Sequence, residues 1–213
     1  MDAPQQNCRA SWTDYQSWDD DTRWEIIDGH PYAMTAPRVS HQTVCGELFA
    51  LLHSHFRGRR CKVLLSPVDV RLSEHDVVQP DLIVVCDQTQ ILETHIEGPP
   101  SLAVEILSPS TQRHDRVRKL RLYARCGVQE YWIFQPNPAL VEVLALDGEG
   151  YRIAGVYTEL DRLASPLFPE LTLELAEIFR AIDEEPVEEI REASPPYTAT
   201  ASSVGQRSPA PTP

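Results

Sequence analysis

At 213 residues, 42% of them hydrophobic, the chain is long enough for one domain with a substantial core. Its formal net charge of −13 is opposite in sign to that of most nucleic-acid-binding proteins. No apolar run is long enough to span a bilayer, and residues 1–7 lack the basic and apolar regions of a signal peptide.

The five cysteines are scattered along the chain, at Cys8, Cys45, Cys61, Cys86 and Cys126. Their number is odd, and no two of them form a C-x-x-C pair. This pattern favours free thiols in a reducing cytoplasm over a disulfide framework or a zinc site. We therefore expect a cytoplasmic protein without disulfide bonds.

The elements predicted for the first half are a helix over 13–20, hairpin strands over 24–27 and 31–34, a helix over 40–58, and strands over 62–65 and 68–72. Thr13 and Gln16 fit a capping box at the start of the first helix. Asp28-Gly29 is a common hairpin turn. Apolar residues at helical spacing indicate the second helix, which Ser40 could cap.

The elements predicted for the second half are strands over 81–85 and 102–107 with a short helical crossing over 89–97 between them, a helix over 108–125, and strands over 130–134, 140–146 and 151–157. The first two strands are continuous apolar runs, which suit a sheet covered on both faces. Residues 171–182 have a strand-like start and an amphipathic end.

Composition divides the chain into three parts. Residues 1–12 are predicted to be disordered, residues 13–183 to form one domain, and residues 184–213 to form a disordered tail rich in Glu, Pro, Ser and Thr. The order of elements predicts an α/β (α+β) fold with a mixed central sheet flanked by helices.

Two carboxylates occur in apolar strands, where charged residues are rarely buried without a partner. Asp81 opens the first of these strands and Glu105 interrupts the next. If the strands are neighbours, the acids lie side by side, and a divalent cation such as Mg²⁺ would compensate their charge. The carbonyl oxygen of Ile106 is a plausible third ligand. Taken singly, Asp81 could instead cap a strand, and Glu105 could pair with an arginine.

Asp115 and Lys119 are four residues apart on the predicted helix after Glu105. In one interpretation they form an exposed ion pair on a solvated helix face. In the other, the helix lays this face over the metal, and the Lys119 ammonium positions the attacking water or stabilises developing charge. Composition alone favours the first interpretation.

A longer set of motifs carries a family resemblance. It comprises Trp24-Glu25-Ile26-Ile27-Asp28-Gly29, Pro67 to Leu72, Pro80-Asp81, Val104 to Thr111 and Glu130-Tyr131-Trp132-Ile133, with His41, Asp115, Lys119 and Tyr123 between them. In this combination the chain resembles, from Thr13 to about Ile178, the Uma2 family of restriction-endonuclease-like proteins in the PD-(D/E)XK nuclease superfamily.

The resemblance implies that Asp81 and Glu105 are metal ligands. The superfamily places a lysine two residues after the Glu, but this chain has Leu107 there. In proteins similar to Uma2 the lysine is shifted to the following helix, where Lys119 matches it. Glu25 matches an acid that often completes such sites, although it could equally be a surface charge of the hairpin.

The same resemblance implies Mg²⁺- or Mn²⁺-dependent hydrolysis of DNA phosphodiester bonds, by a homodimer if both strands are cut. Substrate contacts would come from Arg113, Arg116 and Arg118, which could hold the DNA backbone, and from His41 and Asp115. His41 could also merely cap a helix. The alternative function is a non-catalytic module that keeps the nuclease fold and binds nucleic acid or protein.

Overall fold

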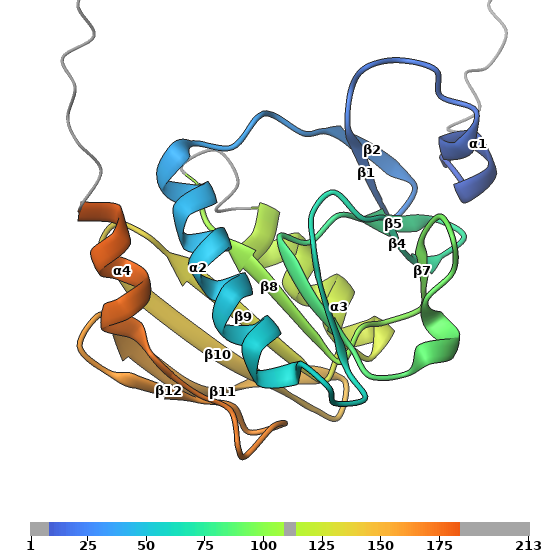
Figure 1. The fold of residues 1–213 in the computed structure, drawn as a ribbon. Helices are drawn as coiled ribbons and strands as arrows, with labels where there is room; N and C mark the ends of the chain where they lie inside the picture. Colours follow the sequence, from blue (N-terminus) through green and yellow to red (C-terminus); the bar gives the residue numbers. More distant parts are fainter. Residues whose placement is uncertain (1–8, 109–113, 184–213) are drawn as a thin grey trace, which may run out of the picture.

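The computed structural model describes residues 9–108 and 114–183 and contains three sheets with helices packed around the largest (Figure 1). The six-stranded sheet has the order β11 (Gly150–Thr158), β10 (Leu140–Asp147), β9 (Glu130–Gln135), β8 (Leu102–Ile106), β6 (Leu82–Val85), β3 (Lys62–Leu65). The five-stranded sheet has the order β2 (His30–Ala33), β1 (Trp24–Ile27), β5 (Asp76–Val78), β4 (Val70–Ser73), β7 (Ile96–Glu97). Strands β12 (Arg162–Ala164) and β13 (Thr172–Glu174) pair with each other.

The helical elements are α1 (Trp12–Gln16), α2 (Val39–Phe56), a 3-10 turn η1 (Gln88–Gln90), a π-helical segment η2 (His114–Lys119), α3 (Leu120–Cys126) and α4 (Leu175–Asp183). Helices α2 and α4 cover one face of the six-stranded sheet, and α3 covers the other (Figure 1). Strands β8 and β9 are parallel, and the connection between them passes through η2 and α3. The sheet is therefore mixed and flanked by helices, as predicted.

Side chains along β8 point alternately to the α2 face and to the α3 face of the six-stranded sheet. Leu102, Val104 and Ile106 join the core beneath α2, whereas Ala103 joins the core beneath α3. Successive side chains of a strand point to opposite faces, so Glu105 lies on the α3 face with Ala103. The sequence of β8 thus directs its one carboxylate toward the helix that follows.

The five-stranded sheet is attached to the rest of the molecule by apolar packing and by one arginine. Ile27 and Val78 of this sheet belong to the same buried cluster as Leu122 of α3. At the end of α3, Arg125 Nη2 lies 2.9 Å from Asp28 Oδ1 and 2.7 Å from Asp76 Oδ1. Both carboxylates come from the five-stranded sheet or its β1–β2 turn, so Arg125 joins that sheet to α3.

Most predicted elements are confirmed to within two residues. They are the strands over 24–27, 31–34, 62–65, 81–85, 102–107, 130–134, 140–146 and 151–157, and the helix over 40–58. Residues 171–182 become β13 followed by α4, which matches their strand-like start and amphipathic end.

Other predictions were wrong in detail. Helix α1 ends at Gln16 rather than near 20, and its capping box is formed by Ser11 with Asp14 rather than by Thr13 with Gln16. Helix α2 begins before Ser40, at an N-cap without a side-chain hydrogen bond. The segment 89–97 is not a helical crossing, because its end pairs with β4 as strand β7. Of the predicted helix over 108–125, residues 109–113 lie outside the described residues.

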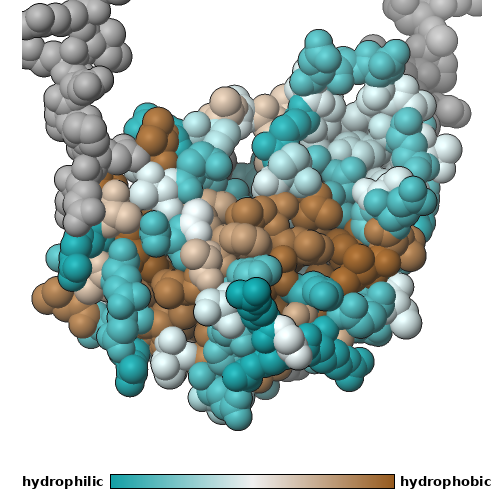
Figure 2. All heavy atoms as spheres, in the orientation of Figure 1, coloured by the Kyte–Doolittle hydropathy of each residue, from teal (hydrophilic) through white to brown (hydrophobic). Residues whose placement is uncertain are grey.

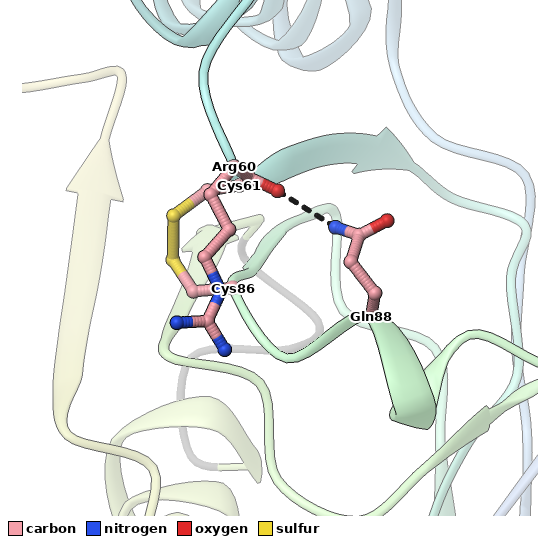
Figure 3. Close-up of a disulfide and its surroundings, with 4 residues drawn as sticks. All are labelled: Arg60, Cys61, Cys86 and Gln88. Carbon is pink, nitrogen blue, oxygen red and sulfur yellow. Dashed lines mark hydrogen bonds between the residues drawn. A yellow bond between two sulfur atoms is a disulfide. The ribbon is translucent and has the colours of Figure 1, made fainter.

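The expectation that the chain has no disulfide bond was wrong. Cys61 and Cys86 are bonded, just before β3 and just after β6 (Figure 3). Lys62 and Val85 are register partners in the β3–β6 pair, so the two cysteines occupy the next facing positions. Among the described residues, Cys45 and Cys126 are free thiols. The argument for a reducing cytoplasm from unpaired cysteines therefore loses its basis.

The folded part of the chain begins earlier than predicted. Ala10 N donates to Gly29 O over 2.9 Å, and Trp12 N donates to Glu74 O over 2.8 Å, so residues 10–12 are already tied to the five-stranded sheet. The other predicted boundary, at 183, stays a prediction, because the predicted tail lies outside the described part. None of the described helices combines the length and apolar character needed to cross a membrane.

Candidate active site

Lys119 lies at the centre of a buried group of carboxylates. Its Nζ atom is 2.8 Å from Glu25 Oε1, 2.9 Å from Glu105 Oε1 and 3.7 Å from Asp115 Oδ1. The side chains of Lys119 and Glu25 are each 3% exposed. Because Glu25 comes from β1, Glu105 from β8 and Lys119 from η2, the group joins both larger sheets to the crossover helix. The interpretation of Asp115 and Lys119 as an exposed ion pair is therefore wrong.

Glu105 has a second partner that the sequence interpretation did not include. Tyr123 of α3 donates its hydroxyl hydrogen to Glu105 Oε1 over 2.7 Å. Lys119 and Tyr123 are four residues apart, so they occupy one face of a helix. That spacing was the available signal in the sequence.

Glu25 is held from three directions. Besides Lys119, the backbone N–H of Gln79 donates to Glu25 Oε1 over 2.8 Å. The Nε2 atom of His114 lies 3.4 Å from Glu25 Oε2, although it makes no hydrogen bond within the described residues. Glu25 is therefore a buried anchor for Lys119 rather than a surface charge of the hairpin. No motif pointed to His114, whose position depends on the η2 geometry.

Asp81 lies just before β6 and accepts two hydrogen bonds. The Ile106 N–H donates to Asp81 Oδ2 over 2.7 Å, and His41 Nε2 lies 3.1 Å from the same oxygen. Register pairs Leu82 with Val104, so Asp81 faces the end of β8 that carries Glu105. His41 therefore contacts the predicted metal ligand and does not cap its helix, since α2 begins at Val39.

Charge balance in this group favours an additional cation. Burial raises the pKa of both Glu25 and Glu105, but Lys119, His114 and the Gln79 N–H reverse this for Glu25 and lower its pKa to about 2. The pKa of Glu105 stays well above its usual range, because burial and the charges of Asp115, Asp81 and Glu25 outweigh Lys119. The carboxylates also raise the pKa of Lys119 well above its usual value, despite its burial. The single positive charge of Lys119 therefore cannot neutralise Glu25, Glu105 and Asp115 together.

The donor set fits a divalent ion held by few protein ligands. Within the described residues, the Asp81 carboxylate accepts hydrogen bonds only at Oδ2 and the Glu105 carboxylate only at Oε1, which leaves one carboxylate oxygen of each for a cation. In the described ranges, no three His, Cys, Asp or Glu side chains are grouped as a complete metal site. Mg²⁺ commonly uses one or two carboxylates and completes its shell with water and substrate phosphate, so a pair of acids suffices.

The predicted substrate-binding residues differ in their surroundings. Arg116 pairs with Glu142 and, at 3.3 Å, with Gln135 Oε1, so its charge is already compensated within the chain. The Arg118 guanidinium lies over the Tyr32 ring, 4.7 Å from its centroid. Asp115 is buried beside Lys119, away from solvent. Arg113 lies outside the described residues.

A crystal structure from Anabaena variabilis, described as a "putative nuclease", has the same fold. It superposes with a TM-score of 0.69 at 18% identity and covers 81% of this chain and 98% of that one. The molecule is therefore of the mixed α/β class represented by that structure.

The chain belongs to the Uma2 family, described as "Putative restriction endonuclease", whose model matches residues 12–176. It is also 29% identical over 154 residues to an uncharacterized protein of Synechocystis, covering 70% of this chain and 81% of the relative. The family resemblance drawn from the motifs is thereby confirmed.

Proposed function

We propose that this protein is an endonuclease that hydrolyses DNA phosphodiester bonds with Mg²⁺ or Mn²⁺. Family membership and the fold support a nuclease. The observation that carries the proposal is the contact of Lys119 Nζ with Glu105 Oε1 at 2.9 Å, with both side chains almost fully buried. This contact places the ammonium of the shifted lysine beside the strand acid that would hold the ion.

Each residue of the group has a distinct role in this proposal. Asp81 and Glu105 would hold the ion through their remaining oxygens, with the Ile106 carbonyl as a further ligand. When bound, the ion polarises the phosphate and lowers the pKa of its water. Lys119 is fixed by Glu25 and Glu105, so its ammonium can donate to the phosphate or the nucleophile without reorganising. The Ile106 N–H and His41 orient Asp81.

A plasmid-nicking assay tests this function. We expect supercoiled DNA to be nicked in Mg²⁺ or Mn²⁺ and to remain intact in EDTA, because the ion supplies the activated water. Glu105→Gln should abolish nicking and leave DNA binding, measured by gel shift, largely unchanged. Glu142→Gln, which removes a carboxylate paired with Arg116 away from the group, is the matched control and should retain activity.

Nicking by Glu105→Gln at the wild-type rate would contradict the site. Parallel reactions with RNA and with small phosphodiesters show whether DNA is the substrate. Sedimentation of the protein with and without DNA tests the proposed homodimer, for which the analogy with double-strand-cutting nucleases is the basis.

A non-catalytic binding module is the second candidate, and three observations favour it. The net charge is −13, and a cavity of about 410 Å³ is lined mainly by Leu64 and by residues 67–69 and 91–96. An apolar band also crosses the face shown in Figure 2, beside α2. Exposed apolar surface of this kind is typical of protein-binding sites. DNA binding without cleavage in any divalent metal would favour this candidate.

A further inference from the structure

A row of aromatic rings extends from α1 to the first residue of β1, and none of these rings has a role in the proposed catalysis. Neighbouring centroids are 5.6 Å apart for Trp12 and Tyr15, 5.5 Å for Tyr15 and Trp18, and 5.7 Å for Trp18 and Trp24. All four rings are partly exposed. The row therefore lies at the surface, with Trp12 at one end and Trp24 at the other.

At its first end, the row already holds a guanidinium group of the chain itself. Arg71 Cζ lies 6.0 Å from the Trp12 ring centroid. Arg71 Nη2 is 2.8 Å from Glu74 Oε2, and Nη1 is 3.1 Å from Glu97 Oε1. An aromatic face and carboxylates together bind a guanidinium by cation–π attraction and charge-assisted hydrogen bonds.

At its other end, the row has the same chemical groups around a cavity. Trp18, Asp20, Trp24 and Pro31 line a space of about 270 Å³. The two indole rings are inclined at 69°. Trp24 Nε1 donates to Asp20 Oδ1 over 3.0 Å, and the Thr22 N–H donates to the same oxygen over 2.9 Å. These bonds hold the carboxylate at the edge of the cavity.

No cation of the described residues occupies this end. The cation–π contacts in the described chain are those of Arg71 and Arg118, and neither involves Trp18 or Trp24. The nearest arginine in sequence, Arg23, is engaged elsewhere, with Gln79 Oε1 at 2.6 Å and Ser66 Oγ at 2.7 Å. The exposed neighbours Asp19 and Asp21 make the local potential more negative.

We propose that Trp18, Asp20 and Trp24 bind the guanidinium group of an arginine side chain presented by a partner protein. The planar guanidinium can stack on an indole and donate two hydrogen bonds to a carboxylate, which a lysine ammonium cannot do in the same geometry. The arrangement at Trp12 shows that the same row holds such a group within the chain. This site is independent of the proposed nuclease function.

The test uses the full-length ¹⁵N-labelled protein and the peptide acetyl-Gly-Gly-Arg-Gly-Gly-amide. The four tryptophans give four indole N–H signals, which single substitutions assign. We expect saturable shifts of the Trp18 and Trp24 signals that weaken as salt is added, since exposed charges are screened. The matched peptide carries citrulline, which keeps the shape of arginine without its charge, and should bind at least about tenfold more weakly.

Two variants of equal charge locate the site. Asp20→Asn should weaken binding at least about tenfold, because it removes the carboxylate that faces the cavity. Asp21→Asn removes an exposed charge that does not line the cavity, and should have a much smaller effect. Equal binding of the citrulline peptide, or wild-type binding by Asp20→Asn, would overturn the proposal. The peptide comparison uses the unmodified protein, so it decides the matter even if a variant fails to fold.

Discussion

At the level of single residues, Lys119 determines whether the buried acids can coexist. Its ammonium contacts Glu25 and Glu105 directly and Asp115 at a longer distance. Removing one partner from a buried ion group leaves the others uncompensated, which costs more than the group contributes when intact. The residue therefore has a structural effect that can be measured apart from catalysis.

We predict that Lys119→Met lowers the free energy of unfolding by about 3–5 kcal/mol, measured by urea denaturation at neutral pH. The matched control is Lys62→Met, which removes an exposed lysine from β3 and should change stability by less than about 0.5 kcal/mol. Equal effects of the two substitutions would show that the acids do not depend on Lys119.

Glu25 gives a pH-dependent prediction. Its pKa falls from an ordinary value of 4.5 to about 2 in the folded protein, so the unfolded state binds more protons between these values. Stability due to Glu25 is therefore present above about pH 4.5 and is lost as the pH falls toward 2. We expect the difference in unfolding free energy between wild type and Glu25→Gln to shrink over this window. A difference that stays constant from pH 6 to 2 would contradict the assignment.

Residue patterns alone could predict part of this site. The positions of Asp81 and Glu105 in apolar strands indicated a cation site, and the family motifs added Lys119 and Glu25. The structure brings Glu25, Glu105 and Lys119 into contact. The contact of Tyr123 with Glu105 was missed, although its four-residue spacing from Lys119 indicated a shared helix face. His114 was missed because its position depends on how η2 turns over the sheet, which no local pattern specifies.

At the level of elements, local sequence patterns predicted the helices and strands that depend on the spacing of their own apolar residues. Apolar runs gave β6 and β8, and helical spacing gave α2. The short strand β7 was misassigned as helix, because its pairing with Val70 and Arg71 of β4 is a long-range contact that polar composition does not reveal. The Cys61–Cys86 bond was missed for the same reason, since the β3–β6 register brings together cysteines 25 residues apart.

This disulfide should contribute measurably to stability. Closing a loop of this length restricts the unfolded chain, which corresponds to about 3.5 kcal/mol in the chain-entropy model. We predict that reduction with dithiothreitol lowers the free energy of unfolding by about this amount. The double variant Cys61→Ser/Cys86→Ser is the control and should not respond to the reductant. An unchanged wild type after complete reduction, verified by mass, would contradict the prediction.

At the level of the whole molecule, the two larger sheets must keep a fixed relation for the acids to meet. Glu25 belongs to the five-stranded sheet, whereas Glu105 belongs to the six-stranded sheet. Near the C-terminal end of α3, which packs on the six-stranded sheet, Arg125 joins the five-stranded sheet to this helix through Asp28 and the buried Asp76. The junction and the acid group therefore hold the same pair of sheets at two places.

We predict that Arg125→Ala lowers the free energy of unfolding by about 1–3 kcal/mol, because Asp76 loses its charged partner. Hydrogen exchange measured by mass spectrometry should become faster in β1 and β2 and stay unchanged in β9 and β10. Arg121→Ala, an exposed arginine on the same helix, is the control. Uniformly faster exchange in all four strands would show that Arg125 does not act on this junction.

The connection between the sheets also limits how the chain can be divided. Along the sequence, the strands alternate between them: β1 and β2 lie in the small sheet, β3 in the large, β4 and β5 in the small, β6 in the large, and β7 in the small. Neither sheet corresponds to one contiguous segment. A single proteolytic cut cannot release either as an intact fragment, and a gene fusion that transplants one must carry strands of the other with it.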